Sequence, residues 1–88
     1  MGVDLVLQRL ESQVGKIRTE FENNAAKELN PATRAQLYSH HQDAKSLEKE
    51  YHAESSRIRA VLDDITLIER WSKERVEARE AKEKAKKA

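Results

Sequence analysis

The side chains best suited to chemistry in this sequence are three histidines and the carboxylates near them. His40 and His41 are adjacent, so they point in different directions on a helix. Glu48 lies four residues before His52, and Asp43 lies three after His40, which are spacings at which two side chains can share a metal ion. A zinc site needs three or four protein ligands. We therefore expect no metal site and no cofactor.

Covalent catalysis would need a nucleophile held beside a base and an oxyanion site, usually on a sharp turn. Ser39 and His40 are only neighbours in sequence, inside a stretch with a helical pattern. The chain also has no glycine-rich loop that could hold a phosphate. We expect no catalytic residues and no enzyme activity.

The composition points to long surface helices. Charged residues make up 38% of the 88 residues and aromatic residues only 5%, with two glycines and one proline, so a β-fold with frequent turns is disfavoured. The absence of cysteine rules out disulfides and fits a reducing compartment, and no window is apolar enough to span a membrane. These features predict an all-α cytoplasmic protein.

The first helix is predicted over residues 5–29, with Asp4 as its N-cap. Its apolar residues follow spacings of 4, 3, 4, 3 and 4, the seam of a helix that packs at a shallow angle on another: Val3, Leu7, Leu10, Val14, Ile17 and Phe21. Asn30 and Pro31 then mark a new helix start, because asparagine is a good N-cap and proline suits the first helical position. A short link of this kind makes the two helices antiparallel, so we expect a helical hairpin.

The second helix is predicted to run without interruption from Pro31 to Lys87. Its seam alternates steps of three and four residues from Leu37 to Ile68, and no glycine or proline follows Pro31. The alternative is a three-helix bundle with a break near Asp63-Asp64, where residues typical of a helix start occur.

The two predicted helices differ in length, and this difference suggests a binding surface. At 1.5 Å per residue the first spans roughly 37 Å and the second roughly 85 Å, so the first ends near Arg57 of the second. The apolar stripe beyond that point would be left uncovered, with about 10 kcal/mol of burial at stake. We expect it to bind a partner through Ile58, Val61, Leu62, Ile65, Ile68 and Trp71.

This reading divides the chain into a helical hairpin with coiled-coil-like packing over residues 1–71 and a charged helical tail over residues 72–88. From residue 71 onward the chain carries seven basic and four acidic residues. Acids occur in every turn of the tail, so the dense basic face with aromatic residues that nucleic-acid binding favours is lacking.

We expect a non-enzymatic protein–protein interaction module, such as an adaptor, a chaperone-like protein or a complex-assembly subunit, whose stripe binds a helical partner or a second copy in a homodimer. The alternative function is binding of nucleic acid or an anionic membrane surface through the basic tail. A third interpretation is that the chain is part of a longer coiled-coil protein.

Overall fold

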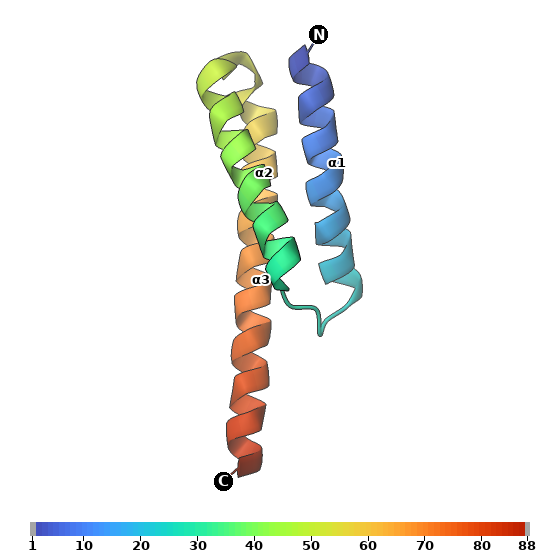
Figure 1. The fold of residues 1–88 in the computed structure, drawn as a ribbon, viewed down its shortest axis with the longest axis vertical. Helices are drawn as coiled ribbons and strands as arrows, with labels where there is room; N and C mark the ends of the chain where they lie inside the picture. The colour runs from blue at the N-terminus through green and yellow to red at the C-terminus, as the bar shows by residue number, and fades with distance from the viewer. Residues whose placement is uncertain (1, 88) are drawn as a thin grey trace.

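The computed structural model describes residues 2–87 and is all-helical over that range; Met1 and Ala88, the ends of the two predicted domains, lie outside it. Its elements are α1 (Gly2–Asn23), α2 (Pro31–Glu50), a short 3-10 helix η1 (His52–Glu54) and α3 (Ser55–Lys87). α1 and α3 run in the same direction and α2 runs against both (Figure 1). The fold class is therefore confirmed as all-α, with three α-helices.

The seam of α1 is confirmed by the structure. Its buried residues are Leu7, Leu10, Val14, Ile17 and Phe21. The helix bounds differ from the prediction, since α1 begins at Gly2 and ends at Asn23. Asp4 lies inside the first turn instead of capping it. The Asn24 side chain accepts a hydrogen bond from the Ala26 amide, a local turn that competes with further helix.

The start of α2 is also confirmed. The Asn30 side chain accepts a hydrogen bond from the Thr33 amide at 2.7 Å, and Pro31 occupies the first turn. An asparagine cap satisfies one of the amides that a helix start leaves without a partner, and it needs no contact outside the segment. This is why sequence alone could locate this start.

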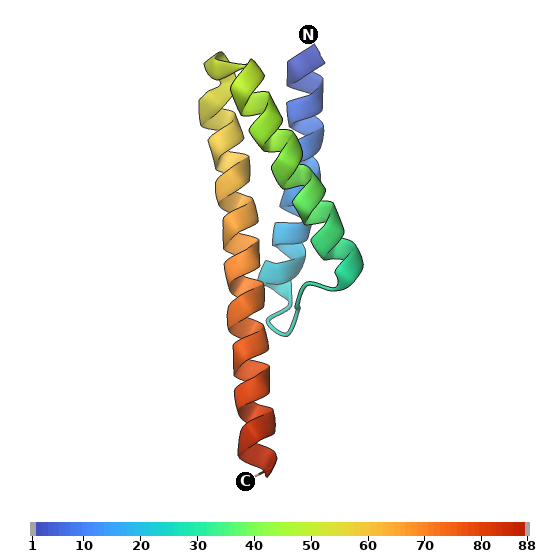
Figure 2. The same ribbon diagram turned by 60° about the vertical axis from the view of Figure 1, so that its left-hand side comes forward.

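The prediction of one continuous helix from Pro31 to Lys87 is wrong. α2 ends at Glu50, Tyr51 takes the non-helical angles φ −128° and ψ 74°, and α3 begins at Ser55. The alternative break near Asp63-Asp64 is also wrong, because both residues lie within α3. Figure 2 shows the chain turning back between α2 and α3 at residues 51–54.

Burial of apolar side chains explains the break in a segment without glycine or proline. Interrupting the helix costs a few backbone hydrogen bonds, each worth about 0.5–1.5 kcal/mol. Folding back lets α3 pack on α1, and each apolar side chain buried this way contributes about 1.5–3 kcal/mol. The break falls where the seam is weakest, at Tyr51 and Glu54, between the apolar residues Leu47 and Ile58.

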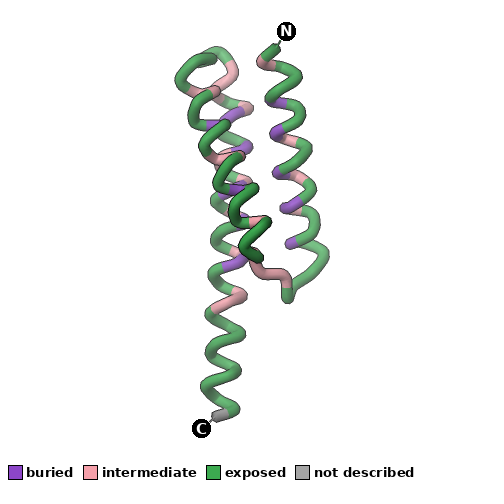
Figure 3. Tube along the Cα trace, in the orientation of Figure 1, coloured by how far each residue is buried: buried purple, intermediate pink, exposed green. Residues whose placement is uncertain are grey.

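The core runs along the upper part of the molecule where three helices overlap (Figure 3). α1 provides five buried residues, α3 provides Ile58, Val61, Ile65 and Ile68, and α2 provides only Leu37 and Ala44. α3 has 33 residues against 22 in α1 and 20 in α2, so its C-terminal part extends beyond the other two helices (Figure 1). The molecule measures 58 × 21 × 21 Å as a result.

Candidate functional site

The predicted partner-binding stripe lies mostly inside the molecule. Ile58, Val61, Ile65 and Ile68 are at most 3% exposed, and Leu62 and Trp71 are half-buried against the same core. The uncovered surface from which we expected partner binding was a consequence of the continuous helix, so it disappears with the break at Tyr51. A single chain covers this stripe with its own α1.

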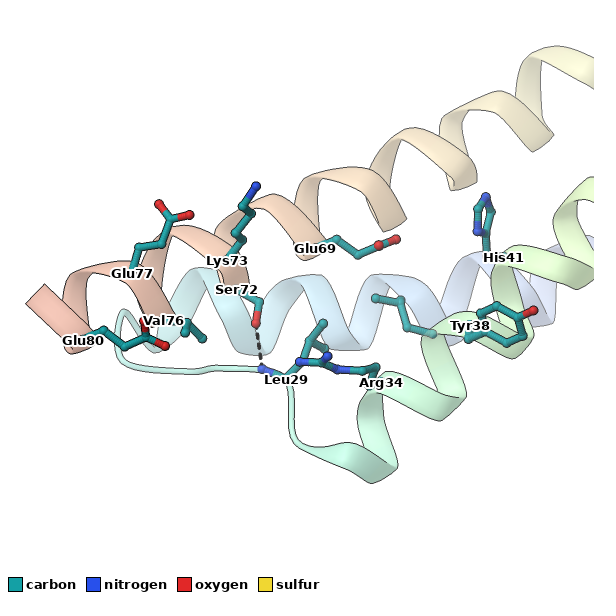
Figure 4. A pocket seen from close by; sticks show the side chains of 11 residues that line it. Leu29, Arg34, Tyr38, His41, Glu69, Ser72, Lys73, Val76, Glu77 and Glu80 are labelled. Atoms are coloured by element: carbon teal, nitrogen blue, oxygen red, sulfur yellow. Dashed lines mark hydrogen bonds between the residues drawn. The ribbon is translucent and has the colours of Figure 1, made fainter.

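Beyond Ile68 the same seam of α3 becomes polar, in step with the end of α1. Ser72 is 3% exposed, and its hydroxyl accepts a hydrogen bond from the Leu29 amide at 2.9 Å (Figure 4). This bond holds the connection between α1 and α2 against α3. A buried serine on an otherwise apolar seam is thereby satisfied, as buried polar groups generally are.

Arg75, one turn further along the seam, binds the C-terminal end of α1. Its guanidinium donates to the carbonyl oxygens of Phe21 at 2.8 Å, Asn24 at 3.1 Å and Lys27 at 3.3 Å. The last carbonyls of a helix have no partner within the helix and carry partial negative charge, so a cation is favoured there. The guanidinium carbon also lies 5.3 Å from the centre of the Phe21 ring and 5.8 Å from that of Trp71, within the range of cation–π attraction.

Three further arginines form ion pairs between α3 and the α1 side of the molecule. Arg57 binds Asp4 at 2.7 Å and Glu11 at 2.8 Å. The pKa of Arg57 is raised above its usual value by its hydrogen bond to Glu11 first and by that to Asp4 second. These pairs fix how far α1 and α3 are shifted along one another, and they are exposed enough for salt to screen them.

The two other arginines act at the middle and the lower end of α1. Arg18 of α1 binds both Glu22 and Asp64, and Arg79 of α3 binds Glu28 of the connection at 2.9 Å. The pKa of Arg79 is raised by its hydrogen bond to Glu28, and the pKa of Arg18 by those to Glu22 and then Asp64. Two of the seven basic residues assigned to the tail, Arg75 and Arg79, are thus bound within the chain.

The histidines are spread over the surface of α2 and η1. His40 and His41 are half-buried and His52 is exposed. Within the range that the structure describes, no group of three or more histidine, aspartate or glutamate side chains is close enough to hold a metal ion. In that range no helix is both long and apolar enough to cross a membrane.

One concave surface of the described residues is a groove between the first half of α2 and the second half of α3. The two helices meet at residues 51–54 and diverge toward Pro31 (Figure 2). A space of about 470 Å³ lies between them. We call it the α2–α3 groove. Its lining comes from the connection and both helices: Leu29, Arg34, Leu37, Tyr38, His41, Glu69, Ser72, Lys73, Val76, Glu77 and Glu80.

The groove combines apolar side chains with charged edges (Figure 4). Leu29, Leu37 and Val76 provide apolar surface, and Tyr38 is 66% exposed although it is a large aromatic residue. Apolar side chains in a concave site with a few polar groups around it are typical of surfaces that bind a partner.

The edges of the groove hold charges that are not used within the molecule. Glu69, Glu77 and Glu80 of α3 form no ion pair with any described residue, and neither do Arg34 of α2 and Lys73 of α3. Most of the ion pairs between described residues involve α1 or the connection that follows it. The edges of the groove therefore carry three carboxylates and two cations that are not paired with a described residue.

A second hollow of about 430 Å³ lies between residues 25–28 of the connection and residues 75–82 of α3. The Arg79–Glu28 ion pair joins two residues of its lining, and Arg75 is bound to backbone carbonyls. Its polar groups are mostly satisfied within the chain, so it is a weaker candidate than the α2–α3 groove.

Sequence reasoning missed the groove, because its apolar residues belong to three segments with no common periodicity. One signal was available. Tyr38 and Val76 lie beside the predicted seams, where a solvated helix would carry polar residues.

Comparison with protein-family models, curated proteins and solved structures found no match for this chain.

Proposed function

We propose that this protein is a non-enzymatic interaction module that binds a helix of a protein partner in the α2–α3 groove. The observation that supports this proposal is the apolar surface formed by the exposed Tyr38 and the half-buried Val76, flanked by charges without partners among the described residues. An amphipathic helix would bury its apolar face there and pair its polar flanks with the two edges, as in other helix-in-groove complexes.

This proposal keeps the kind of activity expected from the sequence and moves its location. The stripe Ile58 to Trp71 is covered by α1, whereas the groove is open without any rearrangement. A surface that is always open to a partner suits both an adaptor and a complex-assembly subunit. These two roles differ in the identity of the partner, so identifying the partner would distinguish them.

Site-specific photocrosslinking in the producing cell tests the proposal. A photoreactive phenylalanine analogue at Tyr38 would lie in the groove, and the same analogue at Val6 would lie on α1, where the side chain is 48% exposed and no groove residue is near in the sequence. We expect a discrete adduct from Tyr38 that is absent from Val6. Introducing Val76→Asp beside the Tyr38 probe should remove the adduct, because a carboxylate would occupy the apolar surface.

Adducts that are the same at both positions, or that persist with Val76→Asp, would contradict the proposal. Circular dichroism and thermal unfolding of Val76→Asp serve as the folding control. A second groove variant, Tyr38→Glu, can be tested as a competitor of the probe-bearing chain for formation of the adduct. This test does not depend on the folding control, since Tyr38 is not part of the core.

A further inference from the structure

We infer that the α2–α3 groove is occupied by the C-terminal part of α3 from a second copy of this chain, in a two-fold symmetric dimer; this inference rests on the proposed function of the groove. The C-terminal part of α3, residues 81–86, is exposed throughout and projects beyond α1 and α2 (Figure 1). In such a dimer, the α2–α3 groove of each chain would contact the projecting part of α3 from the other chain.

Charge is the first argument for a second copy. The groove edges carry three carboxylates against two cations that lack partners among the described residues, an acidic excess. Residues 81–86 carry three lysines against one glutamate, a basic excess, and none of those lysines forms an ion pair with a described residue. Opposite potentials on two surfaces favour their association and set its register.

Shape is the second argument. Ala81 and Ala85 are four residues apart and share one face of α3, and lysines flank that face on both sides. Small side chains let a helix approach closely, which suits a groove with Leu29 and Val76 in its lining. The α3 side of the groove extends from Glu69 to Glu80, roughly 17 Å, so residues 81–87, roughly 10 Å long, fit within it.

Symmetry is the third argument. The groove and the projecting segment lie next to each other on the same helix, so two antiparallel α3 helices that cross between Glu80 and Ala81 place each projecting segment against the groove of the other copy. In that register Glu77 of each chain faces Lys84 of the other, so the same ion pair forms twice. Such a contact uses the same surface on both chains and closes as a dimer.

Charge reversal tests the inference by sedimentation equilibrium at low ionic strength. Wild type should dimerise, whereas Glu77→Lys and Lys84→Glu should each weaken dimerisation at least about tenfold, because each places two like-charged pairs in the contact. An equimolar mixture of the two variants should recover association, since both pairs of the mixed dimer again join a lysine to a glutamate. Both positions are exposed, so the variants should fold as wild type does.

Asp63→Lys is the matched control, because Asp63 is an exposed carboxylate of α3 that lies outside the groove lining and outside residues 74–87, which the contact covers. A wild-type chain that stays monomeric would overturn the inference, and so would a dimer that ignores both reversals or is not recovered in the mixture. The photocrosslinking experiment distinguishes failure of this inference from failure of the proposed function. A Tyr38 adduct containing another protein would support the groove and overturn the second copy, whereas an adduct of twice the chain mass would support both.

Discussion

The two sides of α3 are built differently. Toward α1, α3 packs on five buried residues, and ion pairs of Arg18, Arg57 and Arg79 join it to α1 and to the connection that follows α1. Arg75 of α3 also binds the end of α1. Toward α2, α3 meets two buried residues and a single ion pair between described residues of the two helices, Arg59 with Glu48 at 3.8 Å. One side of α3 is closed and faces the larger number of buried side chains, whereas the other side stays partly open as the α2–α3 groove.

The largest difference between the two sides should appear when one core side chain is truncated on each. Ile65→Ala should cost about 4 kcal/mol of unfolding free energy, because Ile65 is 1% exposed in the centre of the α1–α3 contact. Leu37→Ala should cost about 2 kcal/mol, the low end of the usual range, because the groove beside Leu37 lets water reach the space left behind. Urea denaturation of both variants measures this, and equal losses would remove the distinction.

A smaller effect is expected at the lower end of the closed side. Arg75→Met should cost about 1–3 kcal/mol, because it keeps an apolar stem and leaves the carbonyls of Phe21 and Lys27 without their donor. Arg70→Met, at an exposed position of the same helix without an ion pair to a described residue, should change stability by less than about 0.5 kcal/mol. Similar values for the two variants would mean that Arg75 is not a cap for α1.

The smallest effect concerns motion without any substitution. The amides of α2 should exchange with solvent through local opening, at lower free energy than those in the middle of α1 and α3, because α2 buries only Leu37 and Ala44. Native-state hydrogen exchange followed by NMR measures this residue by residue. Uniform protection across the three helices would show that α2 is as firmly held as α1.

The parts of this fold that sequence could predict are those decided locally. The α1 seam follows from its own spacing, and the start of α2 follows from Asn30 and Pro31, which satisfy the helix end by themselves. The break at Tyr51 has no local cause, because it depends on how much apolar surface α1 covers after the chain turns back. The seam spacing is the same with and without the break, so periodicity could not distinguish the two structures.

The candidate site illustrates the same limit. The predicted length difference was wrong, because the helix expected from Pro31 to Lys87 breaks at Tyr51. α3 does extend beyond its neighbours, but its projecting part is charged and the apolar stripe lies in the covered part. The groove exists because α2 diverges from α3, an angle that no residue pattern specifies. From the sequence, Arg75 was interpreted as one of the charged residues of a solvated tail. Its partners are the carbonyl oxygens at the end of α1, whose position the sequence does not specify.

Labelling of single cysteines tests the central claim most directly, that α3 is closed toward α1 and open toward α2. The chain contains no cysteine, so Val61→Cys and Val76→Cys each introduce the sole thiol at a matched valine of α3, one 3% exposed in the core and one in the groove. At concentrations where the chain is monomeric, Val76→Cys should react without unfolding, within about tenfold of the rate of a free thiol, because Val76 is only half-buried. Val61→Cys should react at least about a thousandfold more slowly, limited by unfolding. Equal rates at the two positions would contradict the account, because they would mean that a single chain does not cover its own apolar stripe.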